Sequence, residues 1–85
     1  MYEKEVCVKN SVGLHSKYAT EFIQKANKYG SLIKISKGED SSNAKSLLGV
    51  LSLGIMGDTV VKITADGDDE EQAVEGLTEF LQNLK

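Results

Sequence analysis

Several residue types are scarce in this chain, and each absence narrows the range of functions. The 85 residues include ten lysines, no arginine and a single cysteine. One cysteine cannot close an internal disulfide, so we expect no redox chemistry at Cys7. Without arginine, a phosphate can be held only by lysine ammonium groups and backbone amides, because the planar guanidinium fork is missing. The net charge of -3 also disfavours nucleic-acid binding, which depends on clustered positive charge.

Long hydrophobic runs are absent as well. No apolar stretch approaches the roughly 20 residues that a membrane span requires, and the first residues, MYEKE, lack the features of a secretory signal. We therefore expect a cytoplasmic protein that binds neither membranes nor nucleic acid. The chain has room for one domain with a modest core, so we expect a monomer with a single domain over residues 1–85.

The spacing of apolar residues predicts alternating strands and helices. Strands are expected where apolar and polar residues alternate, and helices where apolar residues recur every three or four positions. The expected elements are strands over 2–9, 31–37, 40–43 and 59–65, a helix from Ser16 that Gly30 ends as a left-handed cap, a short helix within 46–54, and a last helix after the acidic turn 66–69. This order predicts an α+β fold, a two-layer sandwich whose antiparallel sheet is open to solvent on one face.

The only histidine, His15, lies where the first helix is expected to begin. The first turn of a helix has unpaired backbone N–H groups and the positive end of the helix dipole, which together attract anions. An imidazole is a competent nucleophile near neutral pH, so this position suits a phosphorylated histidine, with Lys17 adding a positive charge. The simpler alternative is that His15 is a capping or surface residue.

A second candidate region is the short helix that follows Ser46. Serine is a favoured N-cap, and a phosphate on Ser46 would add negative charge at a helix N-terminus. The apolar residues after it cannot all face inward from so short a helix, so some should be exposed for a partner: Leu47, Leu48, Val50 and Leu51. The alternatives are that these residues close the edge of the core and that Ser46 is only a cap.

Other chemistries have less support. A zinc site would need more histidines or a cysteine pair, and the acidic turn has Glu71 where a calcium loop of the EF-hand type requires glycine. No spacing pairs a serine with His15 as a hydrolase would need. We therefore expect neither a metal nor a cofactor.

Four segments together resemble the HPr family, the histidine-containing phosphocarriers of the bacterial sugar phosphotransferase system: GLHSKYAT, NAKSLLGVLSLGI, GDTVVKITADGDDEEQAV and the C-terminal FLQNLK. The likeness covers essentially the whole chain in collinear order. It implies an open-faced β-sandwich of four antiparallel strands covered on one face by three helices.

The resemblance also implies a function. His15 would accept a phosphoryl group on Nδ1 from phosphorylated enzyme I and pass it to sugar-specific IIA domains, which makes the protein a carrier rather than an enzyme. Ser46 would be the site of an HPr kinase/phosphorylase, and the helix after it, with Leu47, Leu48 and Leu51, would help to dock partners. A transcription regulator of carbon catabolite control is a further implied partner.

Two of the departures from the family pattern GLHARPA are serious. Lys17 replaces the usual arginine, which keeps the charge but loses the bidentate fork. Tyr18 replaces the usual proline, so a residue pre-set for the first helical turn is lost and an aromatic ring lies near the imidazole. We expect either slower transfer or a different partner.

Two other functions compete with the phosphocarrier. The first is a regulatory module similar to the HPr paralogue Crh, acting through Ser46; the presence of His15 argues against it, because that paralogue lacks the active histidine. The second is an unrelated binding module, since small sheet-and-helix folds serve many functions.

Overall fold

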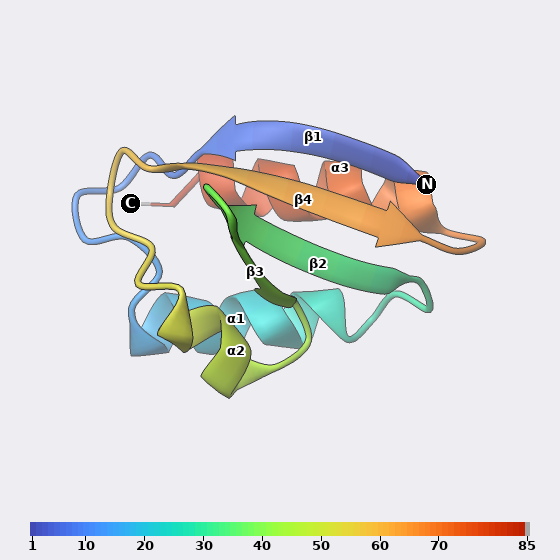
Figure 1. Ribbon diagram of the computed structural model, residues 1–85, viewed down its shortest axis with the longest axis horizontal. Helices are drawn as coiled ribbons and strands as arrows, with labels where there is room; N and C mark the ends of the chain where they lie inside the picture. Colours follow the sequence, from blue (N-terminus) through green and yellow to red (C-terminus); the bar gives the residue numbers. More distant parts are fainter. Residues whose placement is uncertain (85) are drawn as a thin grey trace.

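The computed structural model describes residues 1–84, which form the predicted order of strands and helices (Figure 1). The elements are β1 (Tyr2–Cys7), α1 (Ser16–Ala26), β2 (Leu32–Lys37), β3 (Asp40–Asn43), α2 (Leu47–Ser52), β4 (Val60–Asp66) and α3 (Glu70–Gln82). Lys85, the last residue of the expected domain, lies outside the described residues. No helix within residues 1–84 is long and apolar enough to cross a membrane.

The sheet has the strand order β1-β4-β2-β3, and every neighbouring pair is antiparallel. Strand β4 is central, because it pairs with the whole of β1 on one side and with β2 on the other. The predicted hairpin between β2 and β3 is confirmed, with Lys37 opposite Asp40 and Gly38 at a φ of 61° in the turn. This backbone conformation suits glycine, which has no Cβ to clash.

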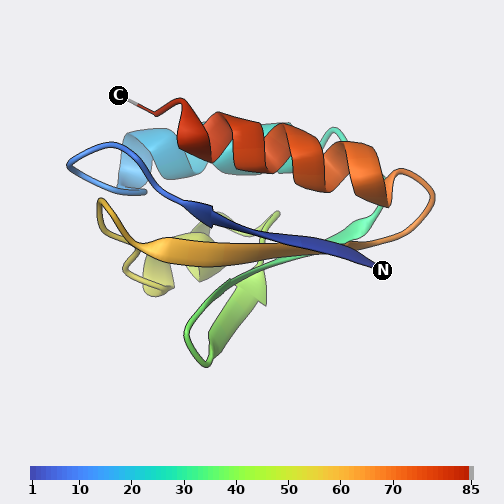
Figure 2. The same cartoon turned by 90° about the horizontal axis from the view of Figure 1, so that it is seen from above.

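Two helices, α1 and α3, lie side by side across one face of the sheet (Figures 1 and 2). The short helix α2 packs against α1 and β3. The other face of the sheet carries exposed side chains, among them Glu3, Lys34 and Val60. The predicted open-faced sandwich is therefore confirmed.

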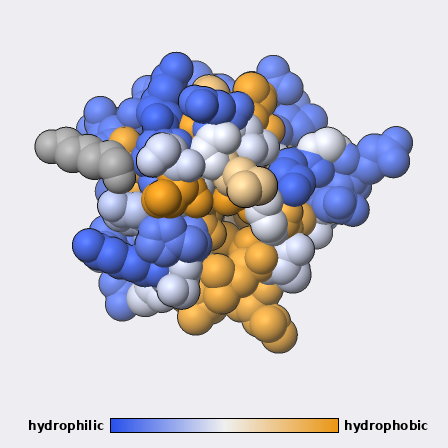
Figure 3. Space-filling model, turned by 90° about the vertical axis from the view of Figure 1, so that its left-hand side faces the viewer, coloured by the Kyte–Doolittle hydropathy of each residue, from blue (hydrophilic) through white to orange (hydrophobic). Residues whose placement is uncertain are grey.

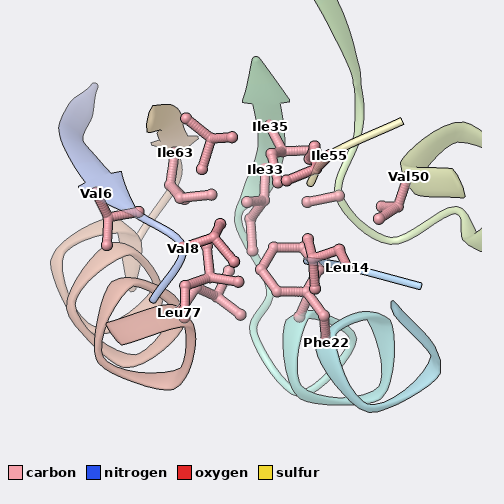
Figure 4. Close-up of a cluster of buried hydrophobic side chains, with 14 of the residues drawn as sticks. Val6, Val8, Leu14, Phe22, Ile33, Ile35, Val50, Ile55, Ile63 and Leu77 are labelled. Atoms are coloured by element: carbon pink, nitrogen blue, oxygen red, sulfur yellow. The ribbon is translucent and has the colours of Figure 1, made fainter. Parts of the chain in front are cut away.

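The core lies between the sheet and its helices. Alternate residues of the strands point inward, such as Val6, Ile35 and Ile63, and they meet Phe22 of α1 and Leu77 of α3 (Figure 4). Burying a side chain of this size stabilises the fold by about 1.5–3 kcal/mol. The period-two and period-3.6 patterns of the sequence thus identify the buried faces.

The predicted end of the first helix was wrong. Helix α1 ends at Ala26 with Asn27 as its C-cap in a right-handed conformation, and Gly30 is not among the residues with positive φ. The Gly30 amide instead donates a hydrogen bond to the Asp69 carboxylate at the start of α3, 2.9 Å away. A contact with a distant residue therefore sets the course of the chain after α1, which local patterns cannot reveal.

Candidate functional site at the start of helix α1

The loop that leads into α1 is held by the side chain of Asn10. This residue is only 4% exposed. Its Oδ1 accepts a hydrogen bond from the Gly13 amide at 3.0 Å, and its Nδ2 donates one to the Gly13 carbonyl at 3.2 Å. One side chain thus fixes both polar groups of the residue two places before His15, so the loop has a defined shape.

The same loop packs against the backbone of residues 55 and 56. The Leu14 amide donates to the Ile55 carbonyl at 2.9 Å, and the Leu14 side chain is buried. Gly13 has a φ of 75°, and a Cβ there would lie 2.3 Å from the Ile55 carbonyl oxygen. Only glycine therefore fits at position 13. Because Gly13 and Leu14 are both held against residues 55 and 56, the backbone that leads to His15 is fixed to the rest of the fold.

His15 is the N-cap of α1, as predicted. Its backbone is extended (φ -82°, ψ -178°), and its carbonyl accepts the first helical hydrogen bond from Ala19 at 2.8 Å. The imidazole is exposed and makes no capping hydrogen bond. The amides of Ser16 and Lys17 precede that first bond, so they have no acceptor within the helix. An exposed imidazole therefore lies next to backbone N–H groups that can bind an anion.

Tyr18, in the first turn of α1, contacts both His15 and Lys17. The ring centroids of His15 and Tyr18 are 5.0 Å apart with the planes tilted by 59°, and Lys17 Nζ lies 5.6 Å from the centroid of the Tyr18 ring. These are contact distances for an aromatic pair and for a cation and a ring. The ring of Tyr18 is thus a neighbour of each of the two exposed residues His15 and Lys17.

Ser46 is the N-cap of α2, and its backbone is extended (φ -107°, ψ 117°). Its Oγ accepts a hydrogen bond from the Gly49 amide at 3.1 Å, and its carbonyl accepts from Val50 at 2.9 Å. The predicted capping role is therefore confirmed.

The apolar residues of α2 divide as the sequence predicts. Val50 is buried, whereas three side chains remain exposed: Leu47, Leu48 and Leu51. Met56, in the connection to β4, is exposed as well. Figure 3 views the molecule from the left-hand side of Figure 1. It shows apolar surface in the lower part of that side, at the level of α2 in Figure 1. We call this region the α2 surface. It is an exposed apolar surface formed by four side chains: Leu47, Leu48, Leu51 and Met56.

Comparison with known proteins identifies the family. The pattern of the family described as "PTS HPr component phosphorylation site" matches residues 2–83. The phosphocarrier protein HPr of Haemophilus influenzae is 39% identical over 85 residues, which cover all of both chains. This chain belongs to the HPr family of phosphocarrier proteins.

Solved structures agree with this assignment. The structure described as HPr-C-His from Thermoanaerobacter tengcongensis superposes with a TM-score of 0.93 at 41% identity, over 96% of this chain and 92% of that one. The catabolite repression protein Crh of Bacillus subtilis, described as an intertwined dimer with a swapped domain, has a TM-score of 0.80 at 34% identity, over 100% of this chain and 98% of that one. The structural neighbours of this chain therefore include proteins named HPr and a protein named Crh.

Sequence reasoning missed the residues that hold the loop before α1 in place. Sequence reasoning used Gly13 and Ile55 only within the segments that resemble the HPr family, and it gave no role to Asn10 or Met56. An asparagine three residues before a glycine is a signal for a side-chain-stabilised turn. The hydrogen bond from the Leu14 amide to the Ile55 carbonyl has no such signal, because the two residues are 41 positions apart. Within residues 1–84, no group of three or more His, Cys, Asp and Glu side chains is placed to hold a metal ion.

Proposed function

We propose that this HPr-family protein carries a phosphoryl group on Nδ1 of His15. In the proposed cycle, the phosphorus–donor bond of phosphorylated enzyme I breaks as the N–P bond to His15 forms. The N–P bond then breaks as a IIA domain of a sugar permease accepts the group. The protein returns to its starting state and is thus a carrier rather than an enzyme. The observation that carries the proposal is the exposed imidazole at the start of α1.

The surroundings of His15 favour a negatively charged phosphoryl group. The N-terminal amides of α1 and the helix dipole supply partial positive charge, and Lys17 supplies a full one. The first turn of α1 contains no acidic residue. A phosphoryl group on His15 would therefore meet attraction from this helix, without a carboxylate of the first turn to repel it.

A labelling experiment tests the relay. The protein is mixed with radiolabelled phosphoenolpyruvate and enzyme I, and we expect an acid-labile label on the wild type and none on His15→Ala. Lys17→Ala should slow the transfer, whereas Lys28→Ala, which removes an exposed lysine beyond the other end of α1, should not. A wild type that stays unlabelled, or a label that persists in His15→Ala, would show that the proposal is wrong.

We further propose that phosphorylation of Ser46 regulates the protein. Ser46 is half-buried at the N-terminus of α2, next to the α2 surface. A phosphate there would add about two negative charges beside the apolar residues that partners are proposed to bind. Incubation with HPr kinase/phosphorylase and ATP should label the wild type and not Ser46→Ala. Ser52→Ala is the matched control, since Ser52 also lies on α2; a label that survives in Ser46→Ala would contradict the site.

The α2 surface is the proposed docking site for enzyme I and the IIA domains, through Leu47, Leu48 and Leu51. Leu48 is 80% exposed, and Leu32, on the open face of the sheet, is 78% exposed. The two leucines therefore form a matched pair. Leu48→Ser should weaken enzyme I binding in calorimetry, and Leu32→Ser should leave it unchanged. Equal affinities of the two variants would contradict docking on α2.

A Crh-like regulatory role is the second candidate, and the likeness to Crh of B. subtilis favours it. Such a protein would act through Ser46 on a transcription regulator of carbon catabolite control. The labelling of His15 separates the two functions, because a purely regulatory module would not exchange phosphate with enzyme I. We propose that the working form is a cytoplasmic monomer of one domain; sedimentation that shows a stable dimer would instead match the Crh relative.

A further inference from the structure

Tyr18 contacts both groups on which the proposed transfer depends. Its ring centroid lies 5.0 Å from that of His15 and 5.6 Å from Lys17 Nζ. Aromatic pairs are attractive at centroid separations of about 4.5–7 Å, and a cation is attracted to a ring within about 6 Å. The imidazole and the ammonium group are therefore both next to one aromatic ring.

The ring of Tyr18 is better fixed than either of its neighbours. Tyr18 is half-buried and packs against the hydrophobic core, whereas His15 and Lys17 are exposed. Residues three apart at the start of a helix lie on the same side of it, so the tyrosine is placed to support the histidine from the helix. An exposed imidazole without such support changes rotamer within picoseconds to nanoseconds, and only some of its orientations present Nδ1 to a donor.

We propose that Tyr18 is a positioning residue of the His15 site. Its ring limits the orientations of the imidazole and keeps the ammonium group of Lys17 beside it, so that Nδ1 and the positive charge meet the incoming phosphoryl group together. This inference rests on the proposed function, because it assigns Tyr18 a role in transfer through His15. Tyr18 itself takes no phosphoryl group and acts through its ring contacts.

The rate of transfer from phosphorylated enzyme I tests the role of the ring. Tyr18→Leu removes the ring but keeps an apolar side chain against the core, and we expect the rate to fall about three- to tenfold. Tyr18→Phe keeps the ring and should restore most of the rate. Tyr29→Leu is the matched control, because Tyr29 is another half-buried tyrosine packed against the core, beyond the far end of α1; its rate should equal that of the wild type. Thermal unfolding of each variant confirms that it is folded.

Proton NMR of the unphosphorylated protein gives a readout that needs no enzyme I. The Tyr18 ring current should displace the imidazole signals of His15, and Tyr18→Leu should remove this displacement and average the χ1 couplings of His15. Tyr18→Phe should preserve both. A role of Tyr18 in stability alone would leave the χ1 couplings of His15 unchanged, although the ring-current displacement would still be lost with the ring.

Two results would overturn the positioning role: χ1 couplings of His15 in Tyr18→Leu that match the wild type, or a transfer rate in Tyr18→Leu that equals the Tyr18→Phe rate. A wild type that accepts no phosphate from enzyme I would instead overturn the proposed function. In that case the NMR comparison still decides whether Tyr18 orients His15.

Discussion

The starts of α1 and α3 differ in the charge of their first turns. At α3, the N-cap is Asp69, and Glu70 and Glu71 lie in the first turn. The Glu70 carboxylate accepts from the Gly67 amide at 3.1 Å and forms an ion pair with the N-terminal amine of Met1 at 3.0 Å. At α1, the N-cap is His15 and the first turn contains no acidic residue. Neither N-cap side chain, Asp69 or His15, makes a capping hydrogen bond.

The difference separates a structural helix start from one available to an anion. Negative side chains near a helix N-terminus compensate the dipole, so the carboxylates of α3 already occupy that role. Because α1 carries Lys17 in place of a carboxylate, its N-terminal positive field remains unmatched within its own first turn. We infer that the α3 start serves stability alone, whereas the α1 start is also available for the proposed phosphate transfer.

The largest expected effect comes from loosening the loop that presents the α1 start. Asn10→Ala removes two hydrogen bonds to Gly13 inside a buried turn. Leaving such groups unsatisfied should lower the free energy of unfolding by about 2 kcal/mol, as measured by urea denaturation. Ser11→Ala, at the exposed neighbouring residue, should change it by less than about 0.5 kcal/mol. Equal stability of the two variants would show that the Asn10 bonds do not hold the loop.

A carboxylate introduced at the α1 start should make it resemble α3. Ser16→Glu places a negative charge in the first turn beside His15. At a separation of about 6 Å in water, repulsion of a doubly charged phosphoryl group is about 1.4 kcal/mol, or about a tenfold lower rate of transfer from enzyme I. Ser16→Gln, the neutral control, should transfer at nearly the wild-type rate. Equal transfer rates of the glutamate and glutamine variants would show that the reaction does not depend on the positive field at the N-terminus of α1.

The smallest expected effect comes from removing a charge at the α3 start. Hydrogen bonds from the Ser31 hydroxyl and the Gly30 amide lower the pKa of Asp69 below its ordinary value of 3.8. A carboxyl group whose pKa is lower in the folded state stabilises the fold above its unfolded pKa, and this contribution is lost as the pH falls through the folded pKa. Asp69→Asn should therefore be less stable than the wild type at neutral pH.

Urea denaturation at several pH values measures this effect. The difference between Asp69→Asn and the wild type should shrink as the pH falls below 3.8, since the wild-type carboxylate is then progressively protonated. Asp68→Asn, at the exposed neighbouring residue, should differ little from the wild type at neutral pH. A difference for Asp69→Asn that stays constant with pH would contradict the role of its ionised form.

Most of the architecture could be predicted from the sequence because it depends on local periodicity. Alternation in β4 correctly assigns Val61 and Ile63 to the core, and Ser46 correctly marks the start of α2. The predicted end of α1 was wrong, because the Gly30 amide donates a hydrogen bond to Asp69, 39 residues later, instead of capping the helix. A local pattern contains no information about such a partner.

The candidate site was predictable only in part for the same reason. The sequence correctly places His15, Lys17 and Ser46 at helix starts, because helix starts have recognisable sequences. The turn held by Asn10 has a local signal in the sequence, because its partner is Gly13. The support of the site by the Ile55 carbonyl could not be found, because that bond forms only after two loops distant in sequence meet. The contact between the rings of His15 and Tyr18 likewise depends on side-chain rotamers.

The sequence by itself determined the order of elements, the buried faces and the placement of a lone histidine at a helix start, since each depends on neighbours within a few residues. The tertiary structure decided where α1 ends, how its leading loop is anchored and that one tyrosine ring contacts both His15 and Lys17. These features depend on hydrogen bonds and ring contacts that exist only once the chain has folded, because their energies are set by distances and angles rather than by residue order.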